Sequence, residues 1–166
     1  MSAVTNVSLN VAVAEGVSGD LYAGSIPHAA SLALQWLSGT TDNKADTVYS
    51  DTRSAAASAD NLDLRGSLAG VYGTVSFVET KLIYIKNKAT TSGYTLTVGA
   101  GTNGAFAGLF ADLTDKIVIQ PGGAFLWIAP LDGNNLATTA GTADILKIDP
   151  GSNTVSYDIV IIGASA

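Results

Sequence analysis

The chain has 166 residues, of which 47% are apolar and only 13% are charged, with 14 acidic residues against 8 basic ones. This charged fraction is about half of the usual ~25%, and together with a mean hydropathy of +0.32 it excludes an intrinsically disordered chain. A net charge of −6 excludes a general nucleic-acid binder, which needs a basic face. The length predicts one domain, large enough to bury roughly 69% of its unfolded surface without metal or disulfide staples.

Neither a membrane span nor a secretory leader is expected. The longest apolar run, Ile159–Ile162, has the length of a strand and falls far short of the ~18 residues of a spanning helix. Residues 1–7 contain no basic cluster, and Asn6 interrupts their apolar pattern. The absence of cysteine excludes disulfides, thiol catalysis and thiolate zinc sites, and suits synthesis in a reducing cytosol.

The first part of the chain alternates between apolar and polar residues with the period of a strand. In residues 7–13 every second residue is Val or Leu, which predicts a half-buried strand. Residues 16–24 are rich in turn formers. Residues 31–37 are ambiguous, because one spacing fits a capped helix and another places Leu32, Leu34 and Trp36 on one face of a strand. We favour the strand because its neighbours are strands.

Further strands are expected in the middle of the chain. Residues 40–44 are predicted to form a hairpin loop that leads to a strand at 47–50, which residues 54–60 either continue or end in a helical turn. β-Branched and aromatic residues predict strands at 75–78 and 81–87. The second of these has two distinct faces, with Ile83 and Ile85 on one side and Leu82, Tyr84 and Lys86 on the other.

The same pattern continues to the C-terminus, with strands expected at 61–64, 94–98, 116–119 and 124–129. Residues 144–148 and 154–162, joined by the turn sequence Asp-Pro-Gly-Ser-Asn, give the strongest hairpin signal in the chain. Asp accounts for 12 of the 14 acidic residues, and Asp is a common turn residue. Strands separated by such turns predict an all-β fold, an antiparallel sandwich or barrel in one compact domain.

Two motifs could carry chemistry but lack their context. Residues 99–104 read G-x-G-x-x-G directly after a strand, whereas a dinucleotide site also needs a following helix, a second parallel strand and an acidic residue at its end. A Gly-rich surface loop is therefore expected. His28, the only histidine, lies beside Pro27 in a turn-like segment, and no G-x-S-x-G motif accompanies it. A solvated side chain is favoured over a catalytic base.

Acidic residues occur in groups that could serve a glycosidase or a cation. They are Asp60 with Asp63, Asp112 with Asp115, and Asp132 in the run Asp-Gly-Asn-Asn. A glycosidase needs one carboxyl in an apolar pocket, and the pattern provides none, so turn caps are favoured. Bound calcium at residues 60–63 or 132–135 is the less favoured alternative, since no EF-hand loop is present. We expect no catalytic residue, no cofactor and no metal ligand.

The basic and large aromatic residues also have two interpretations. Lys81, Lys86 and Lys88 surround Tyr84 as in a nucleic-acid platform, but a solvated strand face or a subunit salt bridge is favoured in so acidic a chain. Trp36, Trp127 and Tyr94 could stack on sugars, although a core or interface role is more typical of a β-domain. Low charge without pocket chemistry is typical of a protein packed into an assembly.

A series of short segments follows in order from residue 44 to the C-terminus. The segments are Lys44–Arg53 (KADTVYSDTR), Leu62–Leu68 (LDLRGSL), Val75–Phe77 (VSF), Ile83–Asn87 (IYIKN), Leu96–Gly99 (LTVG), Ile119–Gly123 (IQPGG), Ala129–Pro130 (AP), Gly141–Asp144 (GTAD) and Tyr157–Gly163 (YDIVIIG). In this order they resemble the head decoration (cement) proteins and related small virion proteins of tailed bacteriophages, over residues 31–166.

The resemblance implies a jelly-roll-like sandwich in which residues 31–37 form a strand. It also implies a homotrimer on the outer capsid surface that clamps neighbouring capsomers, with the major capsid protein as partner and with no catalytic residues. Such a protein is made in the host cytoplasm and ends in the virion, without contact to nucleic acid or membrane.

The expected organisation is an N-terminal strand or arm at residues 1–30, which can belong to the same domain, and a β-sandwich domain at 31–166. The arm is expected to add to the edge of a neighbour's sheet. Two alternatives stay open, a tail or fibre component and a carbohydrate-binding module that uses Trp36 or Trp127. The interface candidates are Val7, Leu9, Val11, Trp36, Lys86 and Trp127.

Overall fold

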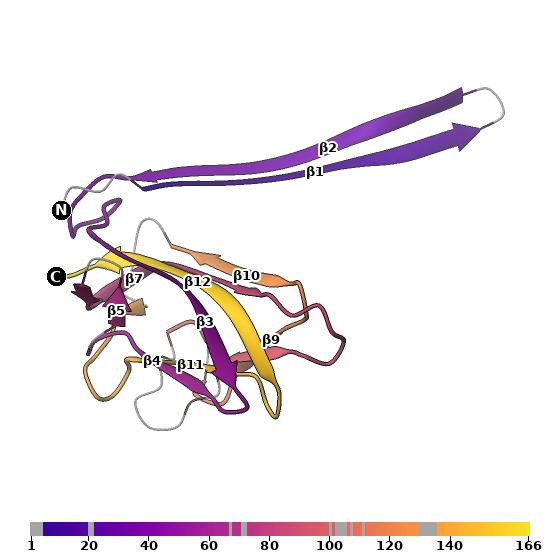
Figure 1. Cartoon of the computed structure of the whole chain (residues 1–166). Coiled ribbons are helices and arrows are strands. Elements are labelled where there is room, and N and C mark those ends of the chain that lie inside the picture. Colours follow the sequence, from indigo (N-terminus) through magenta and orange to yellow (C-terminus); the bar gives the residue numbers. More distant parts are fainter. Residues whose placement is uncertain are drawn as a thin grey trace.

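The computed structural model describes residues 5–19, 22–66, 68–70, 73–99, 101, 106, 108–110, 112–129 and 136–166. The regular elements in these ranges are strands. No helix within them is long and apolar enough to cross a bilayer. Figure 1 shows two parts, a body of packed sheets and a two-stranded ribbon that extends far beyond it.

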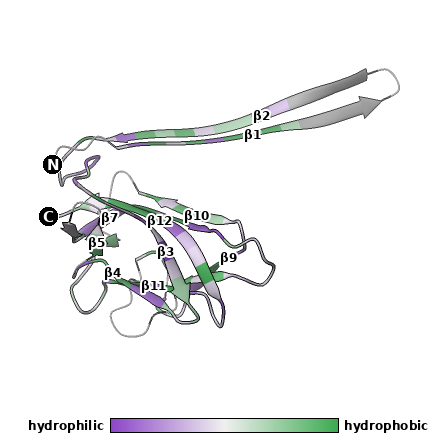
Figure 2. Ribbon diagram, viewed as in Figure 1, coloured by the Kyte–Doolittle hydropathy of each residue, from purple (hydrophilic) through white to green (hydrophobic). Residues whose placement is uncertain are grey.

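The ribbon, called the arm below, consists of β1 (Thr5–Gly19) and β2 (Tyr22–Trp36). The two strands pair antiparallel along their whole length, from Thr5 opposite Trp36 to Gly19 opposite Tyr22. Strands of 15 residues reach about 50 Å. Figure 2 shows hydrophobic residues recurring along the coloured part of both strands, well away from the body.

The body is a sandwich of antiparallel sheets, which confirms the predicted all-β fold. The first sheet has the order β10 (Ala124–Ile128), β7 (Glu79–Asn87), β12 (Thr154–Ala164), β3 (Thr47–Ala56), and the second β4 (Asp60–Asp63), β11 (Ile145–Asp149), β8 (Leu96–Gly99), β9 (Lys116–Ile119). A short pair, β5 (Leu68–Gly70) and β6 (Gly73–Val75), lies beside β3. Numbered along the chain, the eight sandwich strands have the orders 6-3-8-1 and 2-7-4-5.

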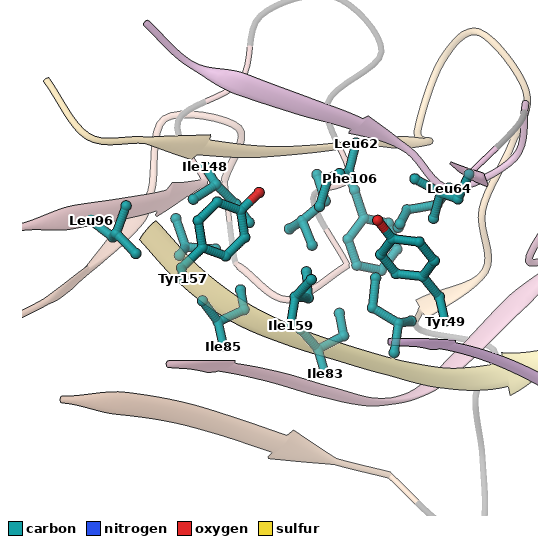
Figure 3. Close-up of a cluster of buried hydrophobic side chains, with 14 of the residues drawn as sticks. Tyr49, Leu62, Leu64, Ile83, Ile85, Leu96, Phe106, Ile148, Tyr157 and Ile159 are labelled. Carbon is teal, nitrogen blue, oxygen red and sulfur yellow. The ribbon is translucent and has the colours of Figure 1, made fainter. Parts of the chain in front are cut away.

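The core fills the space between the two four-stranded sheets. Figure 3 shows Tyr49, Ile83, Ile85, Tyr157 and Ile159 of the first sheet facing Leu62, Leu64, Leu96, Phe106 and Ile148 on the other side. The predicted faces of residues 81–87 are confirmed, because Ile83 and Ile85 belong to this core and Leu82 packs in a second cluster outside it. Alternation within a strand therefore separates two different apolar environments.

The strongest predicted hairpin is wrong. Residues 144–148 and 154–162 do form strands around a turn, but β11 pairs with β4 and β8, and β12 pairs with β3 and β7. The turn carries the chain from one sheet to the other. It has the expected turn chemistry, since Asp149 Oδ1 accepts a hydrogen bond of 2.8 Å from the Gly151 amide and Gly151 has a φ of +66°. Turn residues fix the reversal of the chain, but they do not fix which strands pair.

The N-terminal region also departs from the expectation. The strand assignment of residues 31–37 is confirmed up to Trp36. The hairpin predicted at residues 40–44 is wrong, because β2 pairs with β1 and β3 pairs with β12, so the two strands that flank these residues do not pair with each other. The strands of the arm continue into the turn-rich segment 16–24, because β1 ends only at Gly19 and β2 already begins at Tyr22. The arm thus reaches Trp36, beyond the predicted boundary at residue 30. The strand predicted at residues 75–78 is confirmed only at Val75, the last residue of β6.

Candidate interaction surface

The arm has two chemically different faces because directly opposed residues of an antiparallel pair point to the same side. One face, called the apolar face, carries the pairs Val7–Leu34, Leu9–Leu32, Val11–Ala30 and Val13–His28. The other carries small and polar pairs, Asn6–Gln35, Ser8–Ala33, Asn10–Ser31 and Ala12–Ala29. A hydrogen bond of 3.0 Å from Gln35 to the Asn6 side chain spans this second face. The predicted strand at 7–13 therefore has the expected alternation.

Burial changes along the apolar face from the body outward. Trp36 is 1% exposed, and Val7 and Leu34 are half-buried. Farther out, Leu9 is 44% exposed, Val11 50% and Val13 56%. The sequence predicts a half-buried strand here, and the structure buries only its first part. No described residue covers the outer part of the apolar face.

The base of the arm packs on the outer side of the first sheet. Trp36 forms a cluster with Ala45, Leu82 and Ile162, and partly buried residues surround it: Val7, Leu34, Tyr84, Leu126, Ile128 and Val160. The alternating pattern of β7 and β12 thus supplies a second apolar patch on the face opposite the core. Trp36 anchors the arm to the body and is not free to stack on a sugar ring.

A buried lysine holds the segment that links the arm to the body. Lys81 is 1% exposed, and its Nζ donates hydrogen bonds to the carbonyl oxygens of Thr41 at 2.9 Å and Lys44 at 2.8 Å. Glu79 lies 3.5 Å from the same ammonium group. Because a buried charge is costly unless paired and hydrogen-bonded, these contacts fix the link to the end of β7. Sequence reasoning missed this, since main-chain carbonyl groups leave no signature.

The three lysines of the predicted cluster are therefore not one patch. Lys81 is buried, in contrast to the solvated strand face that was expected, whereas Lys86 is exposed. Lys88 forms an ion pair with Asp158 at 3.0 Å. A continuous basic platform is absent from the described part of β7.

The predicted turn caps are confirmed at several acidic residues. Asp63 Oδ1 accepts hydrogen bonds from the Arg65 and Gly66 amides at 3.0 and 2.6 Å. Asp112 accepts from the Thr114 amide at 2.8 Å, and its own amide donates to Asp115. Asp132 and the segment 132–135 lie outside the described residues. No group of three or more metal-ligating side chains gathers among the residues described.

Asp60 has a different role, which the sequence reasoning also missed. It bridges Arg53, whose Nε lies at 2.7 Å, and the Tyr157 hydroxyl, which donates a hydrogen bond of 2.7 Å. Burial opposes ionisation of Asp60, but the hydrogen bonds from Arg53 and Tyr157 outweigh it and hold its pKa below the usual value. Burial, reinforced by the bond to Asp60, raises the pKa of Tyr157. The group links β3, β4 and β12 across one end of the sandwich.

The remaining candidate residues take structural positions. Trp127 on β10 lies opposite Ile83 and packs, partly buried, against the core. His28 is exposed on the apolar face of the arm, in a strand and not in the expected turn. Gly99 ends a strand paired antiparallel to β9, which contradicts a dinucleotide fold, and a Cβ there would meet the Asp115 carbonyl at 2.6 Å. Most of the loop 99–104 lies outside the described residues.

A shallow hollow of about 420 Å³ lies against the second sheet and the turn after β11. Its charged lining groups are Lys116, Lys147 and Asp149, and Lys147 pairs with Asp149 at 3.2 Å. This lining contains neither a nucleophile–base pair nor two free carboxylates. Among the described residues, the exposed apolar face of the arm is therefore the candidate interaction surface.

Comparison with protein-family models, with curated proteins and with solved structures found no match for this chain.

Proposed function

We propose that this protein is a virion structural component that decorates and stabilises a tailed-phage capsid by binding across neighbouring capsomers. The observation that carries the proposal is an arm about 50 Å long that extends from the sandwich. Beyond the base, the described part of its apolar face has no described partner in its own chain. An exposed apolar stripe of this kind marks a protein contact.

The order of the strands supports a jelly-roll assignment. In the sandwich, the first strand lies beside the eighth and the second beside the seventh, as expected when a long hairpin rolls up into two sheets. This double-sheet architecture is common among viral capsid and lectin domains. The segments that resemble phage decoration proteins coincide with buried strands and turns, among them β7, β8 and β12. These segments therefore support the assignment of the fold, whereas the proposed contact with the capsid rests on the arm.

The mechanism follows from attachment at several points. A homotrimer that engages several capsid subunits converts weak single contacts into avid attachment through effective concentration. A protein that binds only the expanded, assembled lattice stabilises that lattice by linkage. The free edges of the arm's strands can add to a neighbour's sheet. Residues 5–14 and 27–36 contain no Asp, Glu, Lys or Arg, so this part of the arm requires no charged counterpart.

The test uses expanded phage heads assembled without this protein. A short-arm variant, in which residues 11–30 are replaced by Asn-Gly, joins the opposed residues Asn10 and Ser31 by a hairpin turn and keeps the base contacts of Val7, Leu34 and Trp36. We expect full-length protein to sediment with the heads in hundreds of copies and to raise their resistance to disruption. The short-arm variant should lose at least tenfold in occupancy while its body unfolds at the wild-type temperature.

Two outcomes would contradict the proposal. Absence of full-length protein from expanded heads would remove the capsid role. A few copies per particle, found by quantitative gel, would instead assign the protein to the tail or a fibre. Unexpanded proheads serve as the control, because a protein that stabilises the expanded lattice should bind them poorly.

A further inference from the structure

The linker between the arm and the body, residues 37–46, is closed by its own hydrogen bonds. The Ala45 amide donates to the Leu37 carbonyl oxygen at 2.9 Å. Within that loop, the Lys44 amide donates to the Thr41 carbonyl oxygen at 3.0 Å. The linker thus forms a compact loop directly after β2, and the direction of the arm depends on how this loop is seated on the body.

Apolar packing gives the loop a place on the body but no direction. Trp36 and Ala45 lie in the cluster on the outer side of the first sheet. Burial of apolar area is non-directional, so this one cluster leaves the two strands of the arm free to swing about it. Hydrogen bonds are directional, and bonds from the body to the linker can therefore fix the direction of the arm.

Lys81 donates such bonds to two points of the linker. Its Nζ lies 2.9 Å from the Thr41 carbonyl oxygen and 2.8 Å from the Lys44 carbonyl oxygen. Because the side chain is 1% exposed, water does not compete for the ammonium group. Glu79 lies 3.5 Å away and pairs the charge within the body. One buried cation thus joins the linker to β7.

A β-bulge in β7 aims Lys81 at the linker. Neighbouring residues of a regular strand point to opposite faces, yet Lys81 bonds to the linker and Leu82 packs in the cluster at the base of the arm. The register explains this, since Leu82 lies opposite Ile162. The next pair joins Thr80 to Gly163, so Lys81 is the extra residue of the bulge. Bulges turn a side chain away from the face that alternation assigns to it.

The position opposite the bulge needs glycine. A Cβ at Gly163 would lie 2.0 Å from the Glu79 carbonyl oxygen and 2.9 Å from the Phe77 ring. Real Cβ atoms do not approach so closely, so any side chain there would push the two strands apart. The bulge, the glycine opposite it and the buried ammonium group form one local arrangement, whose result is the contact between Lys81 and the linker.

We infer that Lys81 is the positioning residue of the arm, because its two hydrogen bonds to the linker set the direction in which the arm leaves the body. The inference deepens the proposed function, on which its consequence for capsid binding rests. An arm held in one direction loses less conformational freedom on binding than an arm that swings.

The first test measures the direction of the arm in protein without capsids. Because the chain has no cysteine, spin labels can be placed at Ala12→Cys on the arm and Ser54→Cys on β3, two exposed positions. Electron–electron double resonance should give one narrow distribution of distances between these labels. Lys81→Met should roughly double the width of the distribution, since the linker loses its directional bonds. Lys81→Gln, uncharged and shorter, is the second variant and must broaden it as well.

Two control variants separate positioning from stability. Lys86→Met removes an exposed ammonium group from the same strand, and Ile159→Ala destabilises the core between the sheets. Both should keep the narrow distribution. A wild-type distribution in the Lys81 variants with a folded body would overturn the inference. So would a distribution that is already broad in the wild type, or equal broadening in Ile159→Ala.

Head binding is measured separately. Lys81→Met should bind expanded heads roughly tenfold more weakly than Lys86→Met, because its arm must be ordered on binding. Equal binding of these two variants would overturn the consequence for the capsid. Wild-type protein that does not bind heads would overturn the capsid role, while the distance distributions would still decide whether Lys81 positions the arm.

Discussion

The body and the arm are built from the same kind of alternating strand, yet the burial of their apolar faces differs. In the body, the apolar face of each sheet meets the other sheet, and residues such as Ile83 and Ile159 are fully buried. In the part of the arm whose burial is described, Val7, Leu34 and Trp36 next to the body are covered, whereas Val11 and Val13 remain half exposed. Alternation therefore predicts that a face will be buried, but not whether the covering surface belongs to the same chain.

The largest expected effect comes from a cavity in the core of the body. Ile159→Ala should lower the free energy of unfolding by about 4 kcal/mol, because Ile159 is enclosed on all sides and the lost contacts leave a cavity. Urea denaturation followed by tryptophan fluorescence measures this loss. Val11→Ala is the matched control, with an expected change below about 0.5 kcal/mol in the monomer, since Val11 is half exposed. An equal loss of unfolding free energy in the two variants would contradict the conclusion that Ile159 is enclosed in the body and that Val11 is largely uncovered on the arm.

A smaller loss of stability is expected at the boundary between the arm and the body. Trp36→Ala should cost about 3 kcal/mol by removing the centre of the cluster that joins the arm to the body. Hydrogen exchange should then accelerate at the amides of β1 and β2, while those of β7 and β12 keep their protection. Uniform acceleration in both regions would show that the arm and the body unfold as one unit.

The smallest expected effect is electrostatic and depends on pH. Asp60→Asn should cost about 2 kcal/mol at pH 7, because it removes the charge that pairs with Arg53 at the partly exposed end of the sandwich. The pKa of Asp60 is lowered in the folded protein, so its contribution is complete above about pH 5 and is lost as the pH falls through the folded-state pKa. The stability difference between wild type and variant should therefore shrink below about pH 4. A difference that stays constant down to pH 2 would contradict this origin.

The two faces of β7 could be predicted from sequence, because period-2 alternation needs no knowledge of distant residues. The turn at residues 149–153 could be predicted for the same reason, from Asp, Pro and Gly at fixed offsets. The pairing of the strands on either side could not. Whether a turn closes a hairpin or bridges two sheets depends on the complete strand order, and β12 finds its neighbours in β3 and β7.

The arm itself was only partly predictable. Strands at 7–13 and 31–37 follow from their patterns, but glycines between residues 16 and 24 suggested a long turn where the strands continue almost to the tip. The roles of Lys81 and Asp60 were hidden for another reason. Their partners are carbonyl groups at residues 41 and 44 and the Arg53 side chain, and only the folded chain brings these groups together.

The position of β12 also constrains how the chain folds during synthesis. This strand, the last in the sequence, lies in the middle of the first sheet between β7 and β3. Until residues 154–164 leave the ribosome, those two strands have nothing between them and the core stays open. Such long-range pairing raises the contact order and slows folding. The arm precedes every strand of the body in the sequence, so its apolar face is made before the body that carries it has closed.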